Sequence, residues 1–284
     1  MPISDLEKMG AIGGGFGLQK GVKTKVTVQE AQKNHVEVFI NCKPVLDAKT
    51  TKKVVEALLA KTQAKYEVAV EHQIEVPIGM GFGTSAGGAL TAGLAVKEAL
   101  GLPLTYNQIG KIAHVVEIQC QTGLGTVSSL SFSGGCVLVV EAGAPGICQI
   151  DRIPITSDYR IVDGFLQSKI PKTILSSPEK KKAINNHGKK ALDAILAEPS
   201  LENFMDCCWD FAQKAGFATD NICQLVTAAK KAGAVGAAQN MIGEAVHALV
   251  LEENAESVAE AFKQTLPPQQ VIVSKIDFQG ARLL

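Results

Sequence analysis

Apolar and polar residues alternate along several short stretches in the first half of the chain. Alternation puts every second side chain on one face of an extended backbone, so it predicts strands at 22–28, 35–41 and 66–77. Elsewhere apolar residues recur at helical spacing and predict helices at 50–65, 86–100 and 105–122. Thr105 suits the N-cap of the last helix and Gly123 suits its end.

Two glycine-containing stretches give weaker patterns. Five glycines in residues 10–18 predict a turn or a close backbone approach rather than an ordinary strand. The apolar run 131–141 surrounds Gly134-Gly135 and predicts a further strand. The first half therefore mixes strands and helices around glycine-rich connections.

The pattern changes beyond about residue 150, where helical spacing dominates. Helices are predicted at 177–197, 200–215, 221–232 and 255–264. The remaining segments are a glycine and alanine turn at 233–238, an apolar stretch at 244–251 that fits a strand or a helix, and an alternating strand at 271–278. The mixture predicts an α+β fold. The change of pattern lies between Gly146 and Ile170 and predicts domains at 1–150 and 151–284.

Composition and charge exclude several classes of protein. The 284 residues are 46% hydrophobic and 20% charged, which is typical of a chain with a substantial core. The net charge is zero, so a nucleic-acid partner is not indicated. No stretch approaches the ~20 apolar residues of a membrane span and no signal peptide opens the chain, so a cytoplasmic location without a membrane partner is expected. A homodimer is one option for the oligomeric state, which the sequence leaves open.

The seven cysteines do not form a metal-binding pattern. They include no Cys-x-x-Cys pair, and the adjacent Cys207 and Cys208 are badly spaced for one tetrahedral zinc. Most of the seven lie in apolar runs, where cysteine behaves as a small hydrophobe. We expect them to be reduced and structural.

A glycine-rich turn carries the strongest chemical signal, and it reads Pro77-Ile78-Gly79-Met80-Gly81-Phe82-Gly83-Thr84-Ser85-Ala86. It follows a predicted strand and precedes a predicted helix. Glycines let the backbone approach a charged ligand, successive N–H groups form an anion-binding concavity, and the helix N-terminus adds positive potential. The hydroxyls of Thr84 and Ser85 suit phosphate or magnesium. No Gly-Lys-Ser/Thr ends the turn and its glycine spacing differs from the dinucleotide fingerprint, so it is neither of those motifs.

The turn is similar to the second motif of the GHMP kinases, Pro-x-x-x-Gly-Leu-Gly-Ser-Ser-Ala. The resemblance extends over nearly the whole chain and is strongest to the archaeal pantoate kinases of that family. Four further segments carry it: Gly10–Val28, residues 113–125, Ser176–Phe211, and Gly233–Leu249, which resembles the third motif of the family.

This resemblance implies a two-domain fold with a ribosomal-S5-like N-terminal domain and a ferredoxin-like C-terminal domain. It implies that ATP and Mg²⁺ are the cofactors and that the γ-phosphoryl group passes to the hydroxyl of pantoate, on the way to coenzyme A. The phosphate-binding residues would be Gly79, Gly81, Gly83, Thr84, Ser85 and Ala86. Ser85 and Glu117 would hold Mg²⁺.

Other site residues follow from the same resemblance. Thr126 occupies the position of the catalytic Asp of the family, and Glu117 joins it as a catalytic residue. Ala11, His114 and Thr173 match positions near the substrate. Taken alone, Glu117 also fits an exposed helix carboxylate, His114 a core histidine and Thr173 a strand or loop hydroxyl.

The chain departs from the family where the acceptor would react. Threonine at 126 cannot accept a proton as a carboxylate does, and Ala11 replaces a serine of the family. Residues 136–140 are wholly apolar where the family carries an arginine suited to the carboxylate of pantoate. The chain also begins after the usual Pro-Gly-His strand, so either that first strand is absent from the fold or the start lies further upstream.

Three readings follow from these departures. The first is an active phosphotransferase of the pantoate kinase type, which we favour. The second is a catalytically impaired paralogue that binds nucleotide as a regulator or partner. The third is an enzyme with this fold and different chemistry, because fold does not fix function.

Overall fold

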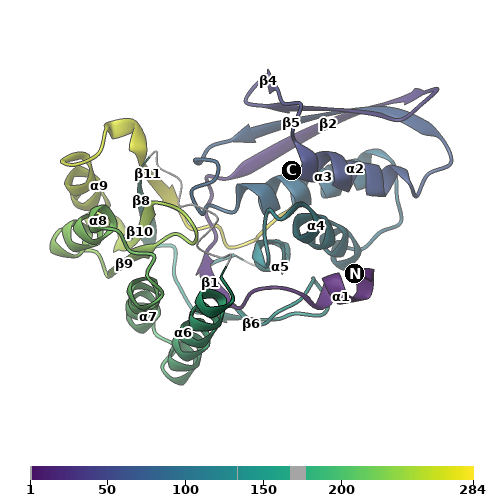
Figure 1. The fold of residues 1–284 in the computed structure, drawn as a ribbon. Coiled ribbons are helices and arrows are strands. Elements are labelled where there is room, and N and C mark those ends of the chain that lie inside the picture. The colour runs from purple at the N-terminus through teal and green to yellow at the C-terminus, as the bar shows by residue number, and fades with distance from the viewer. Residues whose placement is uncertain (1, 133, 167–176) are drawn as a thin grey trace. The chain divides into compact units, whose positions relative to one another are not determined.

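The computed structural model describes residues 2–132, 134–166 and 177–284. The chain divides into two compact units, and each has its own sheet and helices (Figure 1). The first unit comprises Met1–Pro77, Gly83–Asp151 and Phe278–Leu284. The second comprises Ile78–Phe82 and Arg152–Asp277. The division falls inside the glycine-rich turn, because residues 78–82 pack with the C-terminal segments.

The main sheet of the first unit has the strand order β2-β5-β3-β4. The strands are β2 (Val22–Ala31), β3 (His35–Ile40), β4 (Lys43–Pro44) and β5 (Lys65–Ile74). Strand β5 is antiparallel to β2 and parallel to β3. The alternating pattern thus correctly predicted β2, β3 and β5, because one face of each strand is buried and the other exposed.

Helices α2 (Lys49–Leu59) and α3 (Thr84–Ala99) pack beside this sheet, and α4 (Tyr106–Cys120) packs against both (Figure 1). The core between them is built from small and branched side chains such as Val54, Val70, Ala89 and Val116. Thr105 caps α4 as predicted, within a capping box that also uses Gln108.

The predicted end of α4 was wrong. The left-handed residue after the helix is Gln121, with φ 56°, and not Gly123. The prediction of a strand from 131 also needs correction, because helix α5 (Thr126–Phe132) precedes strand β6 (Cys136–Glu141). Ser131 lies in that helix, where its hydroxyl donates to the Val127 carbonyl at 2.7 Å.

A second, three-stranded sheet has the order β1-β6-β7 and shows that residues 13–16 are a strand rather than a turn. The predicted close backbone approach is confirmed at Gly10, where a Cβ would lie 2.9 Å from the Gly143 nitrogen. Strand β1 (Gly13–Phe16) pairs antiparallel with β6, and β7 (Gln149–Ile153) was not predicted. Backbone pairing alone forms β1, so its glycines need no side-chain pattern to join the sheet. Helix α1 (Ile3–Lys8) also escaped prediction and packs against α4 through Leu6.

The second unit is built on a four-stranded sheet of the order β11-β8-β10-β9. Its strands are β8 (Tyr159–Phe165), β9 (Gly236–Gln239), β10 (Ala245–Leu251) and β11 (Val271–Lys275). Residues 244–251 are therefore mainly a strand. The turn predicted at 233–238 is present at its start, at the left-handed Gly233, but residues 236–238 belong to strand β9. Alanine and glycine form β9 because it is fully buried and leaves little room for larger side chains.

Helices α8 (Asp220–Lys231) and α9 (Ala255–Lys263) cover one face of that sheet and share a buried core with it (Figure 1). Val162, Val246 and Phe262 belong to this core. Alternation along the strands turns Asp163 and His247, which are cross-strand partners, to the opposite face. No helix among the described residues is long and apolar enough to span a membrane.

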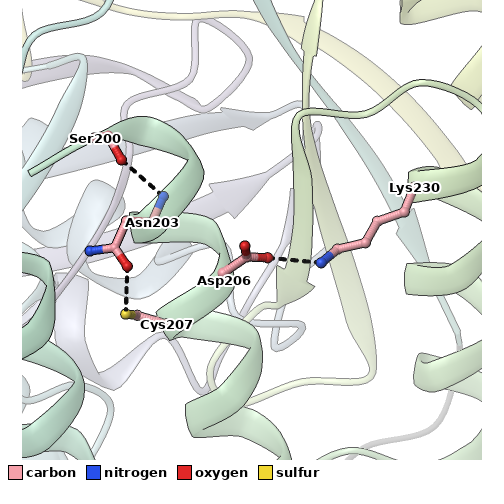
Figure 2. A network of polar contacts seen from close by, with 5 residues as sticks. All are labelled: Ser200, Asn203, Asp206, Cys207 and Lys230. Carbon is pink, nitrogen blue, oxygen red and sulfur yellow. Dashed lines mark hydrogen bonds and ion pairs between the residues drawn. The ribbon is translucent and has the colours of Figure 1, made fainter. Parts of the chain in front are cut away.

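Helices α6 (Pro178–Ala197) and α7 (Leu201–Lys214) form a hairpin with a polar corner (Figure 2). The Ser200 hydroxyl caps α7 by accepting from the Asn203 N–H at 3.1 Å. The Asn203 side chain accepts from the Cys207 thiol, and Asp206 pairs with Lys230 of α8 at 2.8 Å. Among these contacts the exposed Asp206–Lys230 ion pair links α7 to α8, and Cys207 is a free thiol that donates within α7.

Candidate active site

The glycine-rich turn adopts backbone conformations that few other residues tolerate. Gly79, Gly81 and Gly83 have φ angles of 82°, 85° and 63°, all in the left-handed region. Left-handed residues alternate here with ordinary ones, a backbone arrangement that favours an anion-binding concavity. Glycine occurs at every second position of the turn because these positions have left-handed backbone conformations.

The part of the turn that belongs to the second unit packs closely against the loop after β9. A Cβ on Gly81 would lie 2.8 Å from the Asn240 Cβ and 2.9 Å from the Asn240 carbonyl oxygen. Conversely, a Cβ on Gly243 would collide with the backbone of Met80. Each loop thus needs a glycine where the other backbone passes, and side chains at these positions would force the two apart.

The part that belongs to the first unit forms the start of α3. Gly83 is the N-cap residue and has no side chain with which to cap the helix. The first turn therefore presents backbone N–H groups that an anion can bind. Thr84 is nearly buried and Ala86 is fully buried in the core. Thr126 packs on this turn, since its Cγ2 lies 2.6 Å from the Cβ position of Gly83.

Glu117 lies beside the same turn and is buried, with only 2% of its surface exposed. Its reading as an exposed helix carboxylate is therefore wrong. The carboxylate accepts hydrogen bonds from the Ser85 and Thr122 hydroxyls. Desolvation raises the pKa of Glu117, and these two donors oppose that rise. The absence of a Cβ at Gly123 is also required here, because the carboxylate occupies that space.

His114 and Ala11 each make a hydrogen bond to a backbone carbonyl near this site. The His114 Nε2–H donates to the Met9 carbonyl at 2.9 Å, and desolvation lowers the pKa of the ring. The Ala11 N–H donates to the Leu124 carbonyl at 2.7 Å, which ties the residue to the 122–126 loop. The His114 ring thus faces the N-terminal segment, while Glu117 one turn later faces Ser85. Thr173 lies outside the described residues.

Sequence reasoning missed a buried polar group in the second unit. His247 Nδ1 lies 2.6 Å from Asn240 Oδ1, and the Asn240 side chain also bonds Asp163. Only 1% of Asp163 is exposed, and desolvation raises its pKa to about 8. Asn240 lies in the segment that resembles the third motif, so it could have been noticed in the sequence. Its partners, Asp163 and His247, lie on other strands and follow no sequence pattern.

Comparison with known proteins identifies the family of the chain. Residues 49–134 match the GHMP kinases N terminal domain. The chain is 30% identical to the pantoate kinase of Thermococcus kodakarensis over 267 residues, covering 93% of this chain and 87% of that protein. It is 29% identical to the pantoate kinase of Methanocaldococcus jannaschii over 259 residues, covering 91% and 90%.

The solved structures include a phosphotransferase related to the CoA biosynthesis pathway. It superimposes with a TM-score of 0.84 at 30% identity, covering 98% of this chain and 90% of that one. The fold and the glycine-rich turn define a small-molecule kinase, and the chain belongs to the GHMP kinase family. Within that family it is similar to pantoate kinases over most of its length. The predicted α+β fold of two-domain GHMP kinases is thereby confirmed.

Proposed function

We propose that this protein is a pantoate kinase, which transfers the γ-phosphoryl group of ATP to the hydroxyl of pantoate in coenzyme A biosynthesis. The supporting observation is the glycine-rich turn with Glu117 and Ser85 beside it, in a chain about 30% identical to a pantoate kinase over 93% of its length. Its domains would be 1–150 and 151–284, with residues 78–82 of the nucleotide turn packing among the C-terminal segments.

The residues present fit the nucleotide. The left-handed glycines and the uncapped first turn of α3 supply N–H groups without obstructing side chains. The Ser85 hydroxyl and the Glu117 carboxylate are oxygen ligands of the kind that Mg²⁺ prefers. Bound there, Mg²⁺ would neutralise charge on the transferred phosphate. The buried Glu117 would gain from this cation, because the positive charge favours the ionised carboxylate.

Thr126 leaves the proposed reaction without a general base at this position. Its methyl group lies against Gly83 of the turn, so the residue stands beside the phosphate-binding backbone. It cannot serve as a general base, a role that contributes roughly 10²–10⁴-fold to proton transfers in enzymes. We therefore expect catalysis to rest on positioning and electrostatic stabilisation, and turnover to be slow.

The test is incubation of the purified protein with ATP, Mg²⁺ and pantoate. Formation of ADP is followed by a coupled assay, and phosphopantoate is identified by ³¹P NMR. Mevalonate and homoserine serve as competing acceptors, because kinases of related fold act on them. Ser85→Ala and Glu117→Gln should abolish most activity, and Glu98→Gln, an exposed position on α3, is the matched control. Absence of phosphopantoate above background would refute the proposal.

A further inference from the structure

A buried histidine lies beneath the first turn of α3 and belongs to a chain of hydrogen bonds. His72 is in the middle of β5, with 4% of its surface exposed. Its Nε2 lies 3.0 Å from the Thr51 Oγ1 of α2, and its Nδ1 lies 2.8 Å from the Thr24 Oγ1 of β2. The Thr24 hydroxyl contacts the Thr91 Oγ1 at 2.5 Å, and Thr91 reaches the Gly87 carbonyl at 2.7 Å.

The number of available protons determines which group donates in each of these hydrogen bonds. The Gly87 carbonyl can only accept, so the single hydroxyl proton of Thr91 is donated to it. Thr91 must then accept from Thr24, and Thr24 in turn must accept from the His72 ring. The opposite direction would leave two oxygens 2.7 Å apart with no proton between them.

The same count fixes the tautomer of the histidine. Nδ1 carries the proton and Nε2 is the acceptor for the Thr51 hydroxyl, because burial lowers the pKa of His72 to about 4 and keeps the ring neutral. The series of donated hydrogen bonds thus runs from Thr51 through His72, Thr24 and Thr91 to a backbone carbonyl in α3.

The carbonyl at its end belongs to a turn that needs support. Residues 87 and 88 are both glycine, which is the weakest helix former after proline. The N-cap Gly83 offers no side chain to hold the turn. The Gly87 N–H donates to the Gly83 carbonyl at 2.9 Å, so the peptide groups on both sides of Gly87 are held, one by Gly83 and one by Thr91.

We propose that His72 is a positioning residue for nucleotide binding, which acts through Thr24 and Thr91 to hold the first turn of α3 in its phosphate-binding geometry. This inference rests on the proposed function only in naming a nucleotide phosphate as the ligand. His72 itself touches no substrate. Its role is to keep the glycine-rich first turn ordered before the anion arrives, which reduces the entropy lost on binding.

The first experiment reads the tautomer in the free protein. Long-range ¹H–¹⁵N NMR correlations of the His72 ring should show a protonated Nδ1 and an unprotonated Nε2. The signal should persist across neutral pH because the ring stays neutral. Protonation at Nε2 instead would overturn the directed chain, whatever reaction the enzyme catalyses.

The second experiment measures ATP binding by calorimetry without any acceptor. Thr24→Val breaks the chain with an isosteric side chain and should weaken ATP roughly five-fold, the equivalent of about 1 kcal/mol for one hydrogen bond. Thr24→Ser keeps the hydroxyl and should restore the parent affinity. Thr27→Val, at an exposed position of the same strand, should have no effect.

The outcomes separate this inference from the proposed function. Unchanged ATP affinity in Thr24→Val, or the same loss in Thr27→Val, would overturn the positioning role. Lack of ATP binding by the parent protein would overturn it as well. If ATP binds and Thr24→Val weakens it, but pantoate is not phosphorylated, then the choice of acceptor fails and the positioning role stands.

Discussion

The buried Asp163 makes a quantitative prediction about stability. Its carboxyl accepts a hydrogen bond from Asn240, and its Oδ2 has no hydrogen-bond partner among the residues that the structure describes. Desolvation raises the pKa of Asp163 from 3.8 to about 8. The facing titratable group is His247, whose pKa is lowered to about 4 by desolvation, so its ring is neutral at and above pH 5.

The sign follows from proton binding. In the unfolded chain Asp163 releases its proton above its ordinary pKa, whereas the folded protein retains it up to about pH 8. Folding is therefore penalised progressively as pH rises between these two values, by roughly 1.4 kcal/mol per pH unit. Between pH 5 and pH 7 the loss amounts to about 3 kcal/mol. Asp163→Asn keeps the shape of the side chain and removes this titration.

The assay is urea unfolding followed by fluorescence. The single tryptophan, Trp209, packs against the core of the second unit, so its signal reports on the unit that holds Asp163. The stability of Asp163→Asn relative to the parent should increase by about 3 kcal/mol from pH 5 to pH 7. Histidine titrations are common to both proteins and cancel in the difference. Glu253→Gln, at an exposed position, is the control. A difference that stays constant with pH would refute the reasoning.

Three further substitutions test the site and the fold. Thr126→Asp supplies a carboxylate beside the turn and should raise kcat for pantoate roughly 10²-fold, as measured in the coupled assay; unchanged turnover in a folded variant would contradict a missing general base. Gly81→Ala places a Cβ 2.8 Å from Asn240 at a left-handed φ and should weaken ATP at least ten-fold in calorimetry, whereas Gly188→Ala in α6 meets only Phe211 at an ordinary 3.6 Å and should retain the parent affinity. Ser200→Ala removes the cap of α7 and should cost about 1 kcal/mol in urea unfolding followed at Trp209; no loss would mean that the cap hydrogen bond is not stabilising.

Sequence patterns predicted the elements that bury one face. Strands β2 and β5 and helices α2 and α7 have an apolar period that local chemistry alone can produce. The patterns failed where pairing with a distant segment decides the structure. Strand β1 is three glycines and a phenylalanine, and it is a strand because β6 lies beside it. Strand β9 looked like a turn because its close-packed neighbours leave room only for small side chains.

The same distinction explains the site. The turn at 77–86 could be recognised because its function needs consecutive backbone groups, and these leave a local trace of alternating glycines. Its supports leave none: Gly81 is fixed by Asn240, and Gly87 is fixed through Thr91, Thr24 and His72, from strands and helices far apart in sequence. Threonine and histidine are ordinary residues at the polar positions of an alternating strand. Their hydrogen-bond partners, and so their role, can be identified only in the folded structure. The chemistry of phosphate binding is thus local, while the rigidity that gives it affinity is distributed over the surrounding elements.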